Sequence, residues 1–415
     1  MSSIIKSDNG VSSGVTGIVQ TADSSGQLAL QTTTSGGSAV TALTLNNSQQ
    51  ATFANTINVP NTFGFKNRII NGAMVIDQRN NGASVTPSSG NYLVDRFQVQ
   101  LTQASKFTAQ QNAGSVTPPT GFTNYLGFTS SSAYSIGSGD LFDFNQRIEG
   151  YNVSDLGFGT ANAKTVTLSF WVYSSLTGTF GGALGNGNGT RSYPFTYSVP
   201  TANTWTQISI TIAGDTSGTW YTNNSIGLQV IWSLGSGSTY SGTAGAWASA
   251  NYTSATGAVS VVGTSGATFY ITGVQLEVGT QATSFDYRPY TTELQLCQRY
   301  YWKNIFTVGV GPYTVSSTSN GSNIGIYIPN PVYMRASPTT ATSISNSNYD
   351  SSGPTSGNWV LNQPYTQNAT KTGTVVVNSI GDATGVFFSF TGATFSVQPT
   401  GINGNGVYIS ASSEL

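Results

Sequence analysis

The side chains that most enzymes use for catalysis are largely missing from this chain, which contains no histidine and a single cysteine. Without histidine there is no Ser–His or Cys–His nucleophile pair, and no imidazole to act as a general base near neutral pH. Cys297 alone cannot form an intrachain disulfide or a thiolate zinc site. We predict that it is a small buried residue, with an interchain disulfide as the alternative, and we expect no cofactor.

Carboxylate chemistry remains, because two acidic side chains can hydrolyse a glycosidic bond when they lie about 5 Å or about 6.5–9.5 Å apart. The densest acidic group is Asp140, Asp143 and Glu149. These residues also fit a solvated loop that leads into a strand, in which Arg147 pairs locally. We therefore predict no catalytic residue and no enzymatic activity.

Three other acidic residues are conceivable ligands of a structural calcium ion: Asp77, Asp95 and Asp286. None of them lies in a loop of the Asp-x-Asp-x-Asp type. Each has an arginine close by in the sequence with which it can pair instead: Arg79, Arg96 and Arg288. No metal site is predicted.

Aromatic and polar side chains are the abundant chemistry of the chain, with seven Trp and 21 Tyr among many Asn, Gln, Ser and Thr residues. Aromatic rings stack on the apolar C–H faces of a pyranose, and amides and hydroxyls bind its OH groups. The composition is therefore compatible with glycan binding, although the same rings also suit the core of a β-sandwich.

Two aromatic residues are predicted to lie on an exposed strand face. Apolar residues alternate over residues 166–172 and indicate a buried face, which directs Trp171 and Tyr173 to the opposite side. The other aromatic candidates lie in stretches typical of loops at a sandwich edge: Trp220, Tyr221, Trp247 and Tyr252. Arg191 follows a Gly- and Asn-rich turn, where it meets an acidic sugar or phosphate in one interpretation and is merely solvated in the other.

Most elements that position these residues are predicted to be strands. Between residues 66 and 290, alternating apolar runs such as 208–212 and 228–234 are separated by Gly- and Ser-rich turns, which indicates a jelly-roll β-sandwich. The apolar residues change from odd to even positions at Gly273, where we predict a β-bulge. After Pro289, a capping box at residues 292–295 and an apolar i, i+3, i+7 pattern predict one short connecting helix over 291–303.

The two ends of the chain are also predicted to be β-rich, so the whole protein is assigned to the all-β class. Residues 1–65 contain short alternating pieces that cannot build a core alone, which favours a segment that buries them against identical chains. Residues 304–415 contain strand candidates at 324–328, 374–377, 386–390 and 407–410 and are predicted to form a smaller β-sandwich.

The charge of the chain excludes two classes of partner. Charged residues make up only 7% of the sequence, and the formal net charge is −1. The 14 basic residues are scattered without a run, so we expect neither nucleic-acid binding nor a polybasic membrane surface. No apolar run approaches the roughly 20 residues of a membrane helix, and no signal-peptide pattern begins the sequence, so we expect synthesis in the cytoplasm without membrane insertion.

Several motifs resemble a group of bacteriophage tail-fibre proteins that carry a jelly-roll domain similar to carbohydrate-binding modules. They are KNRIINGAMVIDQRNNG at 66–82, YLVDRF at 92–97, VTLSFWVYSSLTGTFGG at 166–182, GVQLEVGTQATSFDYRPYTTELQLCQRYYWK at 273–303, VYMRASPTT at 332–340 and SEL at 413–415. The resemblance implies a homotrimeric tail fibre in the virion. Residues 1–65 then attach to other tail or baseplate proteins, and the distal parts bind polysaccharide of the host surface. Two alternatives stay open: a purely structural head-decorating or baseplate protein, and a polysaccharide depolymerase.

Overall fold

The computed structural model describes residues 65–303, 330–336 and 412–415 in full, parts of two N-terminal strands, and elsewhere the backbone of strands only. The chain divides into two compact units, Met1–Thr62 and Phe63–Leu415. The first unit contains one five-stranded sheet with the strand order β2-β1-β3-β4-β5. Its strands are β1 Ser3–Asn9, β2 Thr16–Gln20, β3 Leu28–Thr33, β4 Ala39–Leu45 and β5 Ala51–Phe53.

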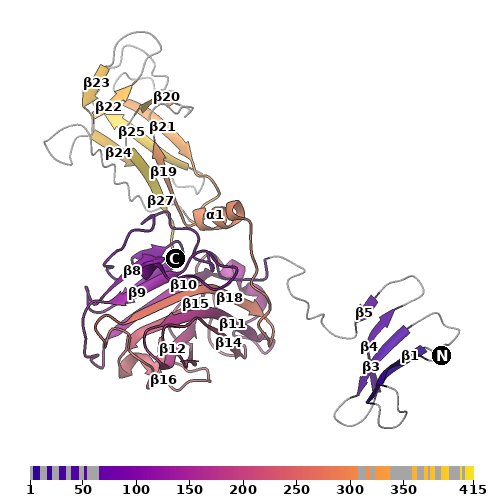
Figure 1. Ribbon diagram of the computed structural model, residues 1–415. Helices are drawn as coiled ribbons and strands as arrows, with labels where there is room; N and C mark the ends of the chain where they lie inside the picture. The colour runs from indigo at the N-terminus through magenta and orange to yellow at the C-terminus, as the bar shows by residue number, and fades with distance from the viewer. Residues whose placement is uncertain are drawn as a thin grey trace. The chain divides into compact units, whose positions relative to one another are not determined.

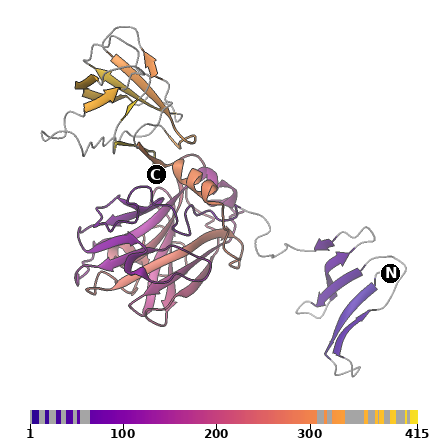
Figure 2. The same ribbon diagram turned by 45° about the horizontal axis from the view of Figure 1, so that its top comes forward.

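The centre of the second unit is a β-sandwich of two antiparallel sheets (Figures 1 and 2). The six-stranded sheet has the order β13-β12-β15-β10-β7-β6, and the five-stranded sheet has the order β14-β11-β18-β9-β8. The strands of the first are β6 Tyr92–Val94, β7 Phe97–Leu101, β10 Leu141–Glu149, β12 Gly178–Gly185, β13 Ser192–Val199 and β15 Ile226–Ser236. Those of the second are β8 Phe107–Gln111, β9 Leu126–Ser130, β11 Val166–Ser174, β14 Thr206–Ile212 and β18 Thr268–Val278.

Short elements join the strands of the sandwich. They are the 3-10 turns η1 Ala113–Ser115, η2 Gly150–Asn152, η3 Ser154–Leu156 and η4 Ser238–Tyr240, and the paired segments β16 Ser241–Gly242 and β17 Ser254–Ala255.

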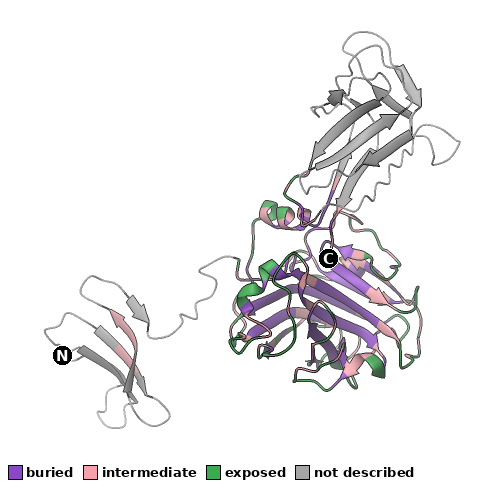
Figure 3. Ribbon diagram, turned by 180° about the vertical axis from the view of Figure 1, so that it is seen from behind, coloured by how far each residue is buried: buried purple, intermediate pink, exposed green. Residues whose placement is uncertain are grey.

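Apolar residues of both sheets form the core between them. Most of the sandwich strands are coloured as buried in Figure 3. Phe144 of β10 stacks on Trp232 of β15 with their ring planes 9° apart, and Phe128 of β9 stacks on Phe144 from the other sheet. On β11, the predicted inward set is buried: Val166, Leu168, Phe170 and Val172. Because strand side chains alternate between faces, this buried set leaves Trp171 and Tyr173 on the outer face, as predicted.

The predicted β-bulge is present at Gly273. Between the pairs Ser169–Gln275 and Trp171–Thr272, one residue of β11 lies opposite two residues of β18. Gly273 has a φ of +62°, which glycine adopts without a steric penalty. The bulge lets Phe269 and Ile271 before it, and Val274 and Leu276 after it, all point into the core.

The connecting helix is shorter than predicted and begins differently. Helix α1 spans Tyr290–Gln298, and β19 begins at Tyr301, so the predicted bounds of 291–303 were wrong. The capping box was also wrong, because the N-cap is Pro289 and no side chain caps the first turn. Glu293 instead pairs with Arg288 at 3.3 Å and accepts a hydrogen bond from the backbone N–H of Asn71. The helix is packed as expected: Cys297 is fully buried beside Ile70, Ile76 and Tyr300.

Strands follow at all four predicted positions of the C-terminal region. Their sheets have the orders β20-β21-β25-β24, β23-β22-β26 and β19-β27. The bounds are β19 Tyr301–Phe306, β20 Val315–Ser317, β21 Asn323–Pro329, β22 Asn358–Leu361, β23 Ala369–Thr372, β24 Thr374–Asn378, β25 Gly385–Thr391, β26 Ile402–Asn403 and β27 Val407–Ser412. That these strands form a smaller sandwich stays a prediction.

Candidate functional site

The outer face of the five-stranded sheet carries an aromatic side chain surrounded by polar ones. Trp171 of β11 is half-buried and lies between Gln207 of β14 and Thr272 of β18. Gln207 and Ser209 are exposed, and cross-strand neighbours in such a pair lie about 4.5–5.5 Å apart. A ring bordered by amide and hydroxyl groups on a strand face presents both the apolar and the polar contacts that a sugar requires. We call Trp171, Gln207 and Ser209 the sheet face.

Trp171 also differs from three other tryptophans in the use of its indole N–H. The Nε1 atoms of Trp205, Trp220 and Trp247 each donate to a backbone carbonyl, at 2.8, 3.0 and 2.7 Å respectively. Within the described part of the chain, Nε1 of Trp171 donates to no acceptor, and it is not among the unpartnered atoms that are shut off from solvent. Its donor is therefore available to a ligand.

Tyr173, the second predicted residue of β11, belongs to an aromatic cluster beside Trp171. Its ring stacks on Tyr270 with the planes 9° apart and contacts Trp205 at a centroid distance of 5.5 Å. Tyr125 packs against both Tyr270 and Trp205. Tyr173 and Trp205 are half-buried, whereas Tyr125 and Tyr270 are buried. The two buried rings therefore support the two half-buried rings at the rim of the sheet face.

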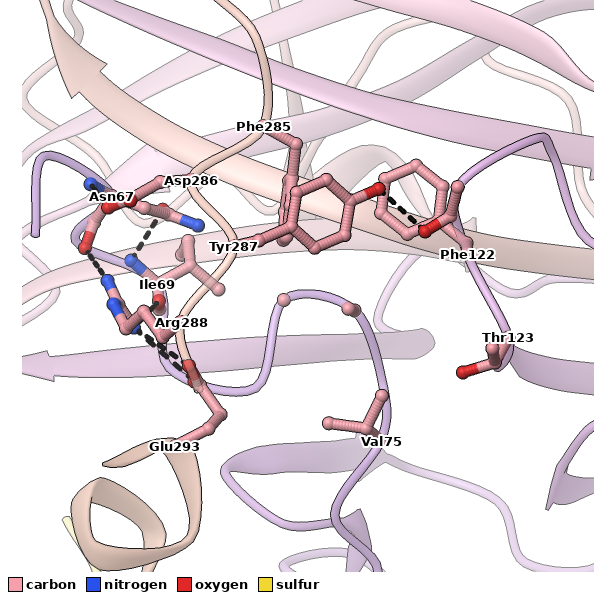
Figure 4. A pocket seen from close by; sticks show the side chains of 13 residues that line it. Asn67, Ile69, Val75, Phe122, Thr123, Phe285, Asp286, Tyr287, Arg288 and Glu293 are labelled. Atoms are coloured by element: carbon pink, nitrogen blue, oxygen red, sulfur yellow. Dashed lines mark hydrogen bonds and ion pairs between the residues drawn. The ribbon is translucent and has the colours of Figure 1, made fainter. Parts of the chain in front are cut away.

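A pocket of about 250 Å³ opens between three segments of the chain (Figure 4). Its lining consists of Asn67, Ile69, Gly72, Ala73, Val75, Gly121, Phe122, Thr123, Phe285, Asp286, Tyr287, Arg288 and Glu293. The rings of Phe122, Phe285 and Tyr287 pack on one another with centroid distances of 4.8–5.6 Å. Tyr287 is 55% exposed, and its hydroxyl donates to the carbonyl of Gly121 at 2.7 Å. Burial raises the pKa of this hydroxyl, so it remains a protonated donor at neutral pH.

The charged groups of the pocket are arranged around Arg288. Its guanidinium donates to the carbonyls of Asn67 and Ile69 and pairs with Glu293, so its charge is neutralised inside the protein. Asp286 is only 3% exposed, and its Oδ2 accepts a hydrogen bond from the backbone N–H of Asn67 at 3.2 Å. These contacts hold the segment at 67–69 against residues 286–288 and the start of helix α1.

A second group of predicted residues meets at a loop cluster of Arg191, Trp220 and Trp247. Trp220 and Trp247 pack edge to face at 5.5 Å, and Phe158 contacts both rings. Arg191 forms a bidentate ion pair with the buried carboxylate of Asp215, through bonds of 2.7 and 2.8 Å, and donates to Ser249. The structure therefore places this cation in an internal pair, which differs from a solvated or ligand-binding turn residue.

The two remaining aromatic candidates lie in the loops near this cluster and not on the sheet face. Tyr221 is 38% exposed and lines, with Trp220, a smaller pocket of about 140 Å³. Tyr252 packs its ring on Gly242, where a Cβ atom would lie 2.3 Å from the ring. The predicted residues thus fall into separate places: Trp171 and Tyr173 on the five-stranded sheet, and the other residues at the loops around β13, β15 and β16.

The acidic residues singled out in the sequence are arranged for structure. Asp143 and Glu149 lie six positions apart on β10, which separates them by about 20 Å at the rise of a strand, too far for a glycosidase pair. Asp140 accepts hydrogen bonds from Tyr134, Gly137 and Thr102. The predicted local pairing of Arg147 was wrong, because Arg147 donates to the carbonyl of Leu415 and Glu149 pairs with Arg299.

The three conceivable calcium ligands are not gathered in one place. Asp77 accepts from the turn at Asn80 and Gly82, and Asp95 accepts from Gln78. The nearby arginines were expected as their partners, but Arg79 and Arg96 pair with Glu414 and Arg288 pairs with Glu293. Among the described residues no group of three or more Asp, Glu, His or Cys side chains is arranged to hold a metal ion.

Several residues of the candidate site were missed in the sequence. Trp205, Phe122, Phe285 and Tyr287 lie in loops or at strand ends, where no alternation indicates which way a side chain points. Composition offered one weak signal, since FDY at residues 285–287 is an aromatic pair within a polar stretch. Their meeting depends on long-range contacts between residue 122 and residues 285–287.

No protein-family model matches this chain, and no curated protein matches its sequence. Among the described residues, no helix is long and apolar enough to cross a membrane.

Comparison with solved structures finds carbohydrate-binding modules with β-sandwich folds. A family 11 carbohydrate-binding module from Clostridium thermocellum, in complex with a β-1,3-1,4-mixed-linked tetrasaccharide, is 11% identical, with a TM-score of 0.25; the match covers 48% of this chain and 97% of that one. The N-terminal cellulose-binding domain of β-1,4-glucanase C from Cellulomonas fimi is 14% identical, with a TM-score of 0.24 and coverage of 42% and 90%. TmCBM61 in complex with β-1,4-galactotriose is 9% identical, with a TM-score of 0.24 and coverage of 44% and 88%. This chain is thus similar in structure to carbohydrate-binding module β-sandwiches.

Proposed function

We propose that the protein binds carbohydrate, without cleaving it, on the sheet face around Trp171. The observation that carries this proposal is the free indole N–H of Trp171 on a half-buried ring that the exposed Gln207 and Ser209 border. A pyranose stacked on the ring is within reach of one donor from the indole and of amide and hydroxyl groups from β14. The indoles of Trp205, Trp220 and Trp247 already donate their N–H groups inside the protein.

The biological setting that we propose is a bacteriophage tail fibre that attaches the virion to polysaccharide on the host surface. The motifs at 66–82, 92–97, 166–182 and 273–303 support this setting through their resemblance to tail-fibre proteins. In this arrangement residues 1–65 join a homotrimer to other tail or baseplate proteins. The working place is the virion tail, and the protein is made in the host cytoplasm.

The test is binding of the full chain to an array of bacterial surface polysaccharides, comparing the wild type with Trp171→Ala. We expect the variant to lose at least tenfold in affinity, since 1.4 kcal/mol equals a factor of ten and buried aromatic anchors exceed this value. Tyr151→Ala is the matched control, because Tyr151 is 61% exposed and lies away from the sheet face on η2. Its affinity is expected to equal that of the wild type.

The loop cluster is compared in the same array through the paired change Trp220→Ala and Tyr221→Ala. If this pair loses binding while Trp171→Ala keeps it, the site lies at the loops and the sheet face is the wrong assignment. If the wild type binds no envelope glycan, a purely structural virion protein becomes the better description. Release of oligosaccharides during the assay would support the depolymerase alternative instead.

A further inference from the structure

The pocket in Figure 4 adjoins the sheet face through a single shared contact region. At Gly273 a Cβ atom would lie 2.7 Å from the ring of Phe122 and 3.0 Å from the ring of Trp171. Both rings therefore border the same glycine, and Phe122 lines the pocket on its other side. Phe122 is therefore the residue that connects the sheet face with the pocket.

The pocket contains one charged group whose hydrogen-bonding capacity is unused. Among the described residues, Oδ1 of Asp286 accepts no hydrogen bond, although the residue is 97% removed from solvent and its Oδ2 is occupied by Asn67. This oxygen is not among the unpartnered atoms that are shut off from solvent, whereas Nε of Arg288 is. A carboxylate oxygen that lines a pocket without a donor fits a ligand that brings hydroxyl donors.

The remaining lining residues limit the charge and the size of that ligand. Arg288 is already neutralised by Glu293, so Asp286 leaves the lining with one net negative charge. A cavity of about 250 Å³ is smaller than the usual 300–1,000 Å³ of drug-sized ligand sites, so it suits a single ring. The exposed ring of Tyr287 and the half-buried ring of Phe122 provide apolar walls for the C–H face of that ring.

We infer that this pocket is a second sugar subsite, next to Trp171, which takes one neutral pyranose and rejects a hexuronate. The inference rests on the proposed function and deepens it by naming the class of sugar. Asp286 accepts one or two sugar hydroxyls, Tyr287 and Phe122 hold the ring, and a uronate carboxylate in the same place faces the like charge of Asp286, which no cation of the lining compensates. Glycans with neutral units at this position therefore bind more tightly than the corresponding acidic ones.

The test uses the full chain and a matched pair of probes: the neutral glycan that binds best, and the same glycan oxidised at C6 to hexuronate units. The wild type is expected to prefer the neutral probe at least tenfold. Asp286→Asn keeps an acceptor for the N–H of Asn67 but removes the charge, so it is expected to reduce this preference at least threefold. Tyr287→Ala, at a 55% exposed position, is expected to lower the affinity for the neutral probe without changing the melting temperature of the protein. Trp171→Ala is expected to lower the affinity for both probes by the same factor.

The outcomes separate this inference from the proposed function. If the wild type binds neither probe nor any other glycan, the proposed function fails and the subsite fails with it. If Trp171→Ala weakens binding but Asp286→Asn and Tyr287→Ala leave affinity and preference unchanged, the sheet face stands and the subsite is overturned. A wild-type preference for the hexuronate probe also overturns it.

Discussion

Gly273 shows how a single residue without a side chain shapes the candidate site. It adopts a φ of +62° at the bulge, and the rings of Phe122 and Trp171 occupy the space where a side chain would lie. Gly273→Ala is expected to destabilise the protein by about 1–3 kcal/mol, because a non-glycine residue is strained at this φ and the new methyl group displaces a ring. Thermal unfolding measures the loss.

The same variant is expected to weaken glycan binding through the displaced Trp171 ring. Gly257→Ala is its control, since Gly257 has a φ of +82° but no atom lies within 4 Å of the added Cβ. The control carries the backbone strain alone and is expected to keep full glycan affinity. If both variants bind equally well, the packing at Gly273 does not position the sheet face.

Asp143 is a second residue with a measurable effect, because it is fully buried on β10 without a cationic partner within hydrogen-bonding distance. Burial raises the pKa of Asp143 to about 7, while an aspartate in the unfolded chain titrates near 4. Between about pH 4 and pH 7 the native state therefore binds one proton more than the unfolded state. The free energy of unfolding is highest below about pH 4 and falls as the pH rises to about 7.

The variant Asp143→Asn is expected to remove this fall and to gain stability over the wild type above pH 7, by about 4 kcal/mol at most. Chemical unfolding at pH 4, 5.5, 7 and 8 measures the difference. Asp140→Asn is the control, because the N–H of Gly137 lowers the pKa of Asp140 and its contribution is lost only at more acidic pH. Equal pH slopes for wild type and Asp143→Asn would contradict the assignment.

The direction of a side chain was predictable from the sequence where apolar and polar residues alternate along a strand. It was not predictable where loops from distant parts of the chain meet. The outward direction of Trp171 and the bulge at Gly273 followed from the period of two, because that period is a property of the local backbone. The partners of Arg191 and Arg288 did not follow, since Asp215 lies 24 residues from Arg191, and Arg288 was considered as a partner of Asp286 but pairs with Glu293. Tertiary ion pairs replaced the local pairing that the sequence suggested.

At the scale of elements, residues 413–415 attach to the sandwich through buried charges. Glu414 pairs with Arg96, whose side chain is 1% exposed, and with Arg79 at 3.1 Å. The guanidinium of Arg96 also lies 3.5 Å from the ring centroid of Tyr300, and Arg147 donates to the carbonyl of Leu415 at 2.7 Å. This short segment therefore connects β6, β7 and β10 with the residues that follow helix α1.

Glu414→Ala is expected to destabilise the protein by about 3–5 kcal/mol, because removing one partner leaves a buried cation without compensation. Asp155→Ala is the control, because it breaks the ion pair of Arg68 at a site where Asp155 is 46% exposed, and its cost is expected to stay below about 1 kcal/mol. Denaturant unfolding of both variants measures the difference. A loss for Glu414→Ala as small as that of the control would mean that the segment does not stabilise the sandwich.

Helix α1 shows why element boundaries were less predictable than element types. The pattern at 292–301 correctly indicated a packed helix, and the burial of Cys297 agrees with it. However, the helix already begins at Tyr290, ahead of the predicted capping box at 292–295, and no side chain caps its first turn. Tyr301 joins β19, which pairs with β27, and this long-range pairing ends the helical region before the predicted residue 303.

At the scale of the whole molecule, the proposed trimer through residues 1–65 would set how many copies of the sheet face act together. The full chain is expected to have a mass in solution of about three times 43.3 kDa, measured by light scattering after size-exclusion chromatography. Linked sites convert later binding events into intramolecular ones, so a trimer gains about 10²–10⁴-fold in apparent affinity on a surface where its sites can bind simultaneously.

Binding to the same glycan immobilised at low and high density therefore distinguishes a trimer from a monomer. A trimer is expected to dissociate far more slowly at high density, whereas a monomer is expected to dissociate at the same rate from both surfaces. Trp171→Ala, which leaves residues 1–65 unchanged, is expected to remain trimeric while losing binding at both densities. A monomeric mass, or equal dissociation rates on the two surfaces, would contradict the trimer.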